Sequence, residues 1–240
     1  MKLTHGVMKL VDTERIGAVI VAAGLSSRMG EFKPLLPFCG NTVVGTIVST
    51  LRSVGAESIV VVTGREAERL KTALGSGVEY VHNASYASTP MFVSACLGLS
   101  EAQYRAERIF FTPADTPLFT RETLLRLLKS EAQVIVPTHF GSSGHPVLLN
   151  ARVVPKILGH PEGTLREALA ACGPAEYIEV PDSGVLLDVD TPSDYALSRL
   201  LAALRRAEPH HAEARARTLA EAGQLRLAEI VRQYMLPNED

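Results

Sequence analysis

The sequence predicts an α/β fold built on a doubly wound, mostly parallel sheet, and three observations lead to this prediction. Short apolar runs recur along the chain, and two of them, Ala18–Val21 and Ile59–Thr63, are followed by glycine within three residues. Stretches with apolar residues at helical spacing lie between the runs. After Asp194 the chain becomes rich in Ala, Leu, Arg and Glu. Buried parallel strands that alternate with helices produce this pattern, and the change of composition marks a helical tail.

The expected elements follow in chain order. The predicted strands are 18–21, 59–63, 79–82, 108–112 and 133–137, and the clearest predicted helices are 42–51 and 66–74. This order is Rossmann-like, and in such a sheet ligands bind beyond the carboxyl ends of the strands. We therefore expect the residues after each strand, at 22–33, 64, 83 and 113–116, to line one crevice.

The domain organisation follows from length and composition. A chain of 240 residues suits one α/β domain with a short appendage. We assign residues 1–15 to an N-terminal leader, 16–197 to the catalytic domain and 198–240 to a helical tail with a break near Pro209. The helical character of the tail begins near residue 195.

Charge and cysteine usage exclude several classes of protein. With 24 basic and 26 acidic side chains, the chain lacks the positive charge that wraps nucleic acid or lies on an anionic membrane. Cys39, Cys96 and Cys172 are too widely spaced for a disulfide scaffold or a cysteine zinc site. The first apolar run, 16–23, is too short to span a bilayer and lacks a clear signal-peptidase site. We expect a cytoplasmic protein that binds neither nucleic acid nor membrane.

The segment after the first strand is rich in small residues and predicts a polyphosphate site. Small residues let backbone N–H groups approach a phosphate, and Gly24 and Gly30 permit unusual backbone angles. Arg28 and Lys33 place two positive charges near those amides, and we predict that both act in catalysis. The predicted nucleotide-binding residues here are Ala22, Ala23, Gly24, Ser26, Ser27, Arg28, Gly30 and Lys33.

Two other glycine-rich motifs are excluded at this loop. A Walker P-loop needs lysine directly after its second glycine, where Glu31 stands, and the dinucleotide motif G-x-G-x-x-G is absent. The alternative is a turn whose arginine and lysine only point into water.

The run A-A-G-x-S-x-R-M-G-x-x-K-x-L resembles the signature of the nucleotidyltransferases that include the molybdenum cofactor cytidylyl- and guanylyltransferases. The resemblance covers residues 16–197. It implies a fold of the nucleotide-diphospho-sugar transferase type and transfer of NMP from an NTP to a phosphorylated acceptor, with release of pyrophosphate. By this resemblance the acceptor is molybdopterin or its molybdenum-loaded form. CTP is preferred over GTP, because the guanylyl branch usually has two glycines where this chain has Ala23 and Gly24.

Two acidic segments predict a Mg²⁺ site. Asp115 ends a predicted strand before Pro117, and a hard carboxylate there suits Mg²⁺. The resemblance also implies a metal ligand at this A-D-x-P position, whereas the alternative is an aspartate that caps a turn. A second predicted strand end carries Asp188 and Asp190 on the same side. The resemblance favours Asp190 as the second ligand, while Asp194 is explained by the first turn of a helix with Thr191 as its N-cap.

Four further positions complete the predicted site. Gly64 and Asn83 each follow a strand, and Asn83 could hydrogen-bond the base or ribose. Relatives continue from this asparagine to Gly-Met, but here Pro90 precedes Met91. His145 lies in a match to the family's G-[NH]-P-V element near the acceptor, and the alternative is a solvated turn. Arg166 ends a looser match over 159–166 and could bind an anionic substrate or simply lie on a helix surface.

The tail has a resemblance of its own. Residues 209–234 resemble the closing part of a His-Asp phosphohydrolase domain, but the metal-binding His-Asp pair is missing and Tyr234 stands where another histidine is expected. His210 and His211 are adjacent, so on a helix they face different directions and cannot easily share an ion. We interpret the tail as a remnant without hydrolase chemistry, with amphipathic helices that pack on the sheet domain or on another subunit.

Two rival functions remain open at this point. The same loop chemistry serves cytidylyl- or uridylyltransferases of sugar and polyol phosphates. A non-catalytic maturation factor that holds the cofactor for a molybdenum hydroxylase would bind nucleotide or pterin without releasing pyrophosphate. The Thr89-Pro90 sequence and the loose 159–166 match are the features that favour this second rival.

Overall fold

A computed structural model of the chain describes residues 14–24, 30–160 and 163–206. The predicted site residues Ser26, Ser27 and Arg28, most of the leader, and the tail beyond residue 206 with its two histidines lie outside this range. No helix in the described part is long and apolar enough to cross a membrane.

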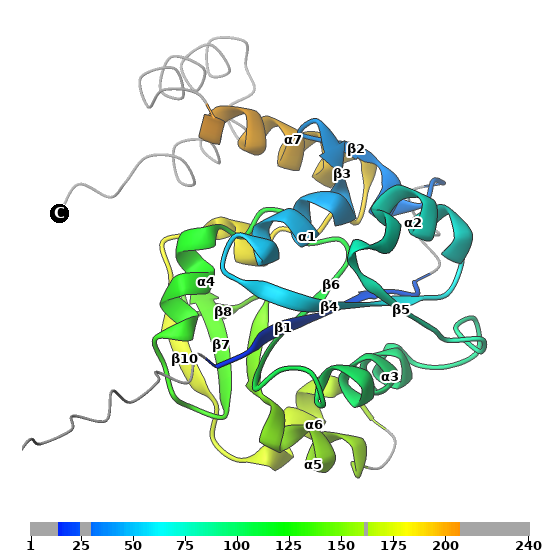
Figure 1. The fold of residues 1–240 in the computed structure, drawn as a ribbon. Coiled ribbons are helices and arrows are strands. Elements are labelled where there is room, and N and C mark those ends of the chain that lie inside the picture. The colour runs from blue at the N-terminus through cyan, green and yellow to red at the C-terminus, as the bar shows by residue number, and fades with distance from the viewer. Residues whose placement is uncertain (1–13, 25–29, 161–162, 207–240) are drawn as a thin grey trace, which may run out of the picture.

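A mixed, mostly parallel sheet forms the centre of the protein (Figure 1). Its strands, in spatial order, are β10 (Glu176–Glu179), β7 (Val134–His139), β9 (Val147–Asn150), β6 (Arg108–Pro113), β1 (Ile16–Ala22), β4 (Ala56–Thr63) and β5 (Glu79–His82). Short β8 (Ser142–Ser143) pairs antiparallel with β7, and β9 runs antiparallel to both β6 and β7. The predicted α/β fold is confirmed, and the antiparallel β9 is the feature that the sequence did not reveal.

Helices cover both faces of the sheet (Figure 1). One layer holds α1 (Val43–Arg52), α2 (Ala67–Leu74) and α4 (Arg121–Leu128), and the other holds α3 (Met91–Ala102), α5 (Val154–Leu158) and α6 (Leu165–Cys172). The side chains of β1 alternate between the two layers. Ala18 and Ile20 pack in the first core, and Val19 and Val21 in the second. A strand buried on both faces reads as the continuous apolar run seen in the sequence.

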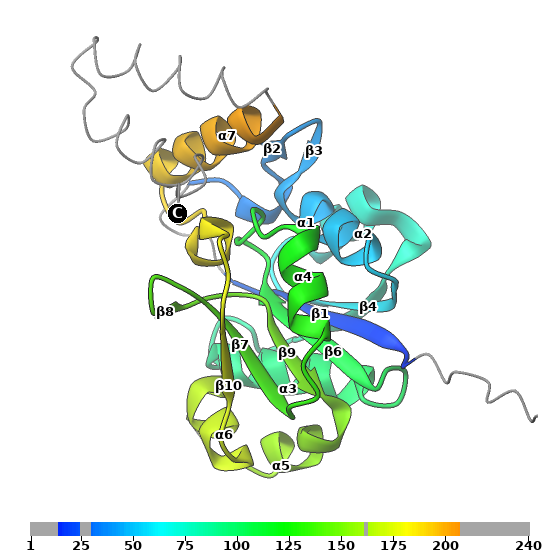
Figure 2. The same cartoon turned by 90° about the vertical axis from the view of Figure 1, so that its left-hand side faces the viewer.

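Helix α7 (Pro192–Arg206) packs beside a small hairpin, β2 (Pro37–Phe38) and β3 (Asn41–Thr42), above the first layer (Figure 2). The expected N-cap is confirmed, because Thr191 Oγ1 accepts a hydrogen bond from Asp194 N at 3.2 Å and Asp194 Oδ2 accepts one from Thr191 N at 2.8 Å. Leu201 and Ala202 are buried in a third apolar cluster. The boundary that we expected at 197–198 therefore falls within a helix that packs against the sheet domain.

The prediction that a strand ends at Asp188 and Asp190 is wrong. Residues 183–186 form a 3₁₀ turn, and residues 187–190 belong to no helix or strand. Instead of joining a ladder, Val189 N donates a hydrogen bond to the backbone carbonyl of Asp115 at 2.8 Å. Close packing against other loops, rather than strand pairing, fixes this segment.

Candidate active site

The carboxyl ends of four parallel strands meet at one edge of the sheet. Ala22 of β1 is paired in register with Thr63 of β4, Thr63 with His82 of β5, and Val21 with Pro113 of β6. The residues that follow these strands therefore emerge side by side, as the sequence predicts. This edge carries the candidate site.

The described part of the glycine-rich loop begins at Ala22 and Ala23, which are buried, and continues to Gly24, which is exposed. Gly30 has a φ of +71°, a left-handed conformation that favours glycine. The loop leads into a short 3₁₀ turn, η1 (Lys33–Leu35), that brings the Lys33 side chain back towards the carboxylates.

Gly64 is a position of close approach. A Cβ built there would lie 2.7 Å from the Cβ of Tyr86 and 2.8 Å from the carbonyl oxygen of Ala23. A side chain at this position would therefore separate the loop after β5 from the loop after β1. Because Gly64 has no side chain, the loops after β1 and β5 can approach each other at the predicted nucleotide site.

Asn83 is buried, and its amide binds its own loop. Its Nδ2 donates to Thr89 Oγ1 at 3.1 Å and to Ser94 Oγ at 2.9 Å, and its Oδ1 accepts from Ser85 N at 3.0 Å. In this structure the side chain holds the 83–89 loop against α3. The predicted contact with base or ribose stays a prediction.

Lys33, Asp115 and Asp190 come together from three distant segments. The Nζ atom of Lys33 lies 2.6 Å from Asp190 Oδ1 and 3.8 Å from Asp115 Oδ2. The Lys33 side chain is 11% exposed, whereas those of Asp115 and Asp190 are 28% and 38% exposed. The two carboxylates thus face one positive charge and remain open to solvent or a ligand.

The environment of Asp115 disfavours its negative charge. Burial, together with the nearby carboxylates of Asp188 and Asp190, raises the pKa of Asp115 from 3.8 to about 6, although Lys33 acts in the opposite direction. Perturbed carboxyl groups of this kind gather at functional sites. An added cation would relieve the repulsion.

Asp188 binds a different partner from Asp190. Its Oδ1 accepts a hydrogen bond from Thr116 Oγ1 at 2.7 Å, whereas Asp190 faces Lys33. The expectation that strand alternation sends both to the same side fails because residues 187–190 form no strand. Asp188 still lies near enough to affect the charges of Asp115 and His145.

The donor set fits the Mg²⁺ that the resemblance implies. Asp115 Oδ2 and Asp190 Oδ1 both point at the Lys33 ammonium, so the fold already gathers them around one cation. Within the described ranges, no group of three or more His, Cys, Asp or Glu side chains is arranged to hold a metal ion. Mg²⁺ commonly takes one or two carboxylates and completes its shell with water and substrate phosphate oxygens, which suits this pair.

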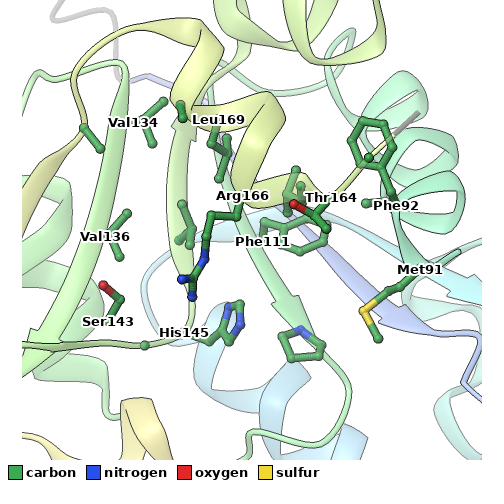
Figure 3. A pocket seen from close by; sticks show the side chains of 18 of the residues that line it. Met91, Phe92, Phe111, Val134, Val136, Ser143, His145, Thr164, Arg166 and Leu169 are labelled. Atoms are coloured by element: carbon green, nitrogen blue, oxygen red, sulfur yellow. The ribbon is translucent and has the colours of Figure 1, made fainter. Parts of the chain in front are cut away.

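A cavity of about 870 Å³ is lined by residues of β6, β7, β9, α3 and α6 (Figure 3). Pro113, two residues before Asp115, forms part of its wall, and most of the lining is apolar, including Phe111, Val136 and Leu169. Arg166 extends from α6 into the space in the direction of His145 (Figure 3). The structure thus brings both predicted acceptor-binding residues into one cavity.

His145 is mostly buried rather than fully solvated. Burial lowers its pKa, while the charge of Asp188 and the backbone of Phe111 act in the opposite direction. Its Nδ1 is buried and has no hydrogen-bond partner within the described structure. Gly144 permits this placement, because a Cβ there would lie 2.3 Å from the carbonyl oxygen of Val185. Burial thus disfavours the protonated imidazole, and one ring nitrogen has no partner among the described residues.

Sequence reasoning missed two parts of the site. Thr116 lies within the range 113–116 that we expect at the crevice, but its hydrogen bond to Asp188 was not predicted. The apolar walls come from β6, β7, β9, α3 and α6, and no local pattern distinguishes them from ordinary core residues.

Comparisons with known proteins agree with this geometry. The family described as MobA-like NTP transferase domain matches residues 18–175. The molybdenum cofactor cytidylyltransferase of Escherichia coli is 30% identical over 189 residues, which cover 77% of this chain and 95% of that protein.

Solved structures give the same picture. A nucleotidyl transferase from Methanothermobacter has a TM-score of 0.68 at 25% identity, with coverage of 78% of this chain and 97% of that one. Rv0371c from Mycobacterium tuberculosis, in complex with manganese, has a TM-score of 0.63 at 25% identity, with coverage of 78% and 99%.

Proposed function

The chain belongs to the family of MobA-like NTP transferase domains and is a nucleotidyltransferase, and from this premise we propose that it transfers CMP from CTP to the phosphate of molybdopterin. The convergence of Lys33, Asp115 and Asp190 beside the glycine-rich loop carries the proposal. The 30% identity to the E. coli molybdenum cofactor cytidylyltransferase, over nearly its whole length, supports both the acceptor and the base.

The chemistry is an in-line displacement. An oxygen of the acceptor phosphate forms a bond to the α-phosphorus of CTP, and the bond from that phosphorus to the bridging oxygen of pyrophosphate breaks. No side chain needs to form a covalent intermediate, so the protein acts through positioning and charge stabilisation.

The residues of the candidate site contribute charge stabilisation and metal binding. The loop amides after β1 and the Lys33 ammonium offset the negative charge of the triphosphate, a task that we also assign to Arg28. Asp115 and Asp190 are the residues that would hold Mg²⁺. When bound, Mg²⁺ supplies charge neutralisation at the phosphates.

The cavity of His145 and Arg166 is the proposed acceptor site. Its apolar walls suit the flat ring system of a pterin, and Arg166 supplies a positive charge for an anionic group. Pro113 in its wall precedes Asp115 by two residues, which supports an acceptor orientation with its phosphate towards the carboxylates.

A turnover assay tests the proposal. Pyrophosphate release is measured with CTP, GTP or UTP and Mg²⁺, with molybdopterin or with a sugar or polyol phosphate as acceptor, and with Lys33→Ala as the inactive control. The proposal predicts release with CTP and molybdopterin. Preference for GTP would reassign the donor, turnover of a sugar phosphate would reassign the acceptor, and nucleotide binding without any release would favour the maturation factor.

A further inference from the structure

Another aspartate, Asp182, is buried outside the candidate site, and both of its carboxylate oxygens accept hydrogen bonds. Its Oδ2 accepts hydrogen bonds from Thr120 N at 2.8 Å, Thr120 Oγ1 at 2.9 Å and Thr123 Oγ1 at 2.6 Å. Its Oδ1 accepts from Gly184 N at 3.0 Å. Asp182 therefore joins the start of α4 to the segment that leads towards Asp190.

Arg205, in the last turn of α7, completes this arrangement. Its Nη2 lies 2.8 Å from Asp182 Oδ1, and its Nη1 donates to the carbonyl oxygen of Leu118. The planar guanidinium can bridge them because its donors have fixed directions, which a lysine does not offer.

Residues 182–190, which we call the strap, contact three parts of the candidate site: His145, the loop of Asp115 and Thr116, and Lys33. The carbonyl of Val185 accepts a hydrogen bond from His145 N at 2.8 Å, and Val189 N donates to the Asp115 carbonyl at 2.8 Å. Asp188 binds Thr116, and Asp190 ends the strap opposite Lys33. The strap thus fixes the acceptor cavity, the Asp115 loop and Lys33 relative to one another.

The strap is packed too tightly to absorb a shift at its start. A Cβ at Gly184 would lie 2.0 Å from the Leu118 carbonyl oxygen, and a Cβ at Gly144 would lie 2.3 Å from the Val185 carbonyl oxygen. Close-packed segments transmit displacement rather than dissipate it. Loss of the Arg205 bridge would leave the Asp182 charge buried without its cation, which disfavours the present position of the strap.

We propose that Arg205, acting through Asp182, is a positioning residue that holds the strap so that Asp190 stays opposite Asp115. This inference rests on the proposed function, because it concerns the metal-binding geometry of that same site. It assigns α7 to the active-site scaffold rather than to a dispensable tail.

Manganese binding tests the inference without measuring turnover. Mn²⁺ is titrated into the full-length protein in the presence of CTP, and free Mn²⁺ is followed by electron paramagnetic resonance. We expect Arg205→Met to weaken Mn²⁺ binding by about tenfold to a hundredfold, the effect typical of groups that orient metal ligands. Arg205→Lys, which keeps the charge but not the fork, should recover part of the affinity and also serves if Arg205→Met does not fold.

The matched control is Arg199→Met. Arg199 is an exposed arginine on the same helix, and its guanidinium lies 5.6 Å from the centre of the Tyr195 ring. We expect wild-type Mn²⁺ affinity from this variant.

Hydrogen exchange distinguishes positioning from general destabilisation. In Arg205→Met, peptides that cover the strap should exchange faster, while peptides from β1 and β4 keep their protection. Unchanged Mn²⁺ affinity, or unchanged exchange in the strap, would overturn the inference. A wild-type protein that binds neither Mn²⁺ nor CTP would instead overturn the proposed function, so the two failures are distinguishable.

Discussion

Asp115 and Asp182 are both largely buried aspartates near a cation, and their surroundings differ in kind. Asp182 receives hydrogen bonds from two threonines and a glycine amide and pairs with Arg205 at 2.8 Å. Asp115 has Lys33 at 3.8 Å and two other carboxylates close by, which help to raise its pKa to about 6. A satisfied buried charge holds structure, whereas an unsatisfied one is available to a ligand.

The largest effect is expected from Lys33→Ala. This change removes the cation on which Asp115 and Asp190 converge and which is placed to meet the triphosphate. We expect turnover to fall by about 10²- to 10³-fold, the range for loss of one preorganised charge-stabilising donor. Steady-state pyrophosphate release measures it, with circular dichroism as the check on folding. Turnover within a factor of two of wild type would remove Lys33 from the site.

The comparison predicts that Asp182→Asn lowers stability. The substitution removes the negative charge that Arg205 and the α4 hydroxyls surround, leaving a guanidinium without its partner. Breaking a buried pair costs about 3 kcal/mol of unfolding free energy. Urea unfolding at pH 7.5 measures the change, and a loss below about 0.5 kcal/mol would contradict the structural role that we assign to Asp182.

Asp115→Asn should raise stability while lowering turnover. The neutral amide is relieved of the repulsion from Asp188 and Asp190, so the metal-free protein at pH 7.5 should gain about 1–3 kcal/mol, estimated from the upward pKa shift. The same urea experiment, run with a chelator, gives the comparison with Asp182→Asn directly. A loss of stability at Asp115→Asn would show that its carboxylate is structural after all.

The pH dependence of that gain has a definite sign. Because the pKa of Asp115 is higher in the folded protein than its usual 3.8, the folded state binds the proton more tightly, and wild-type stability falls as pH rises through about 6. The advantage of Asp115→Asn should therefore be full above pH 7 and should vanish near pH 4. Unfolding curves of both proteins from pH 4 to 8 measure it, and a constant difference would contradict the shift.

The smallest effect is expected at the acceptor cavity. Arg166→Met removes an exposed cation that extends into an apolar space without replacing its aliphatic bulk. The KM for acceptor should rise about tenfold, in line with the loss of one charged hydrogen bond, while the KM for CTP stays the same. Arg152→Met, an exposed arginine outside the cavity lining, is the control. Equal effects on the KM for acceptor and the KM for CTP would contradict the assignment of Arg166 to the acceptor site.

The sequence predicted those parts of the molecule that depend on interactions between residues close together in the chain. The apolar runs of β1 and β4 and the cap at Thr191 need only near neighbours to be recognised. The sequence placed Asp115 at the crevice because it follows a buried strand, and its role as a metal ligand stays a prediction.

Tertiary contacts determine what could not be predicted. Residues 187–190 have the alternation of a strand. However, Val189 N donates its hydrogen bond to the carbonyl of Asp115 instead of to a neighbouring strand. The alanine- and leucine-rich α7 looks like a separate tail in the sequence. The buried Leu201 and Ala202, and the contact of Arg205 with Asp182, show that it belongs to the domain. The apolar cavity could not be predicted from the sequence, because the residues in its walls have the same apolar character as core residues.

The most direct test of the account is calorimetric titration of CTP, with and without Mg²⁺, into wild-type protein and Asp115→Asn. The account predicts that Mg²⁺ tightens CTP binding in the wild type and that this enhancement is lost in the variant, although the variant is folded and more stable. Equal enhancement in both proteins, or no CTP binding to the wild type under either condition, would contradict the assignment of Asp115 to a metal-assisted nucleotide site.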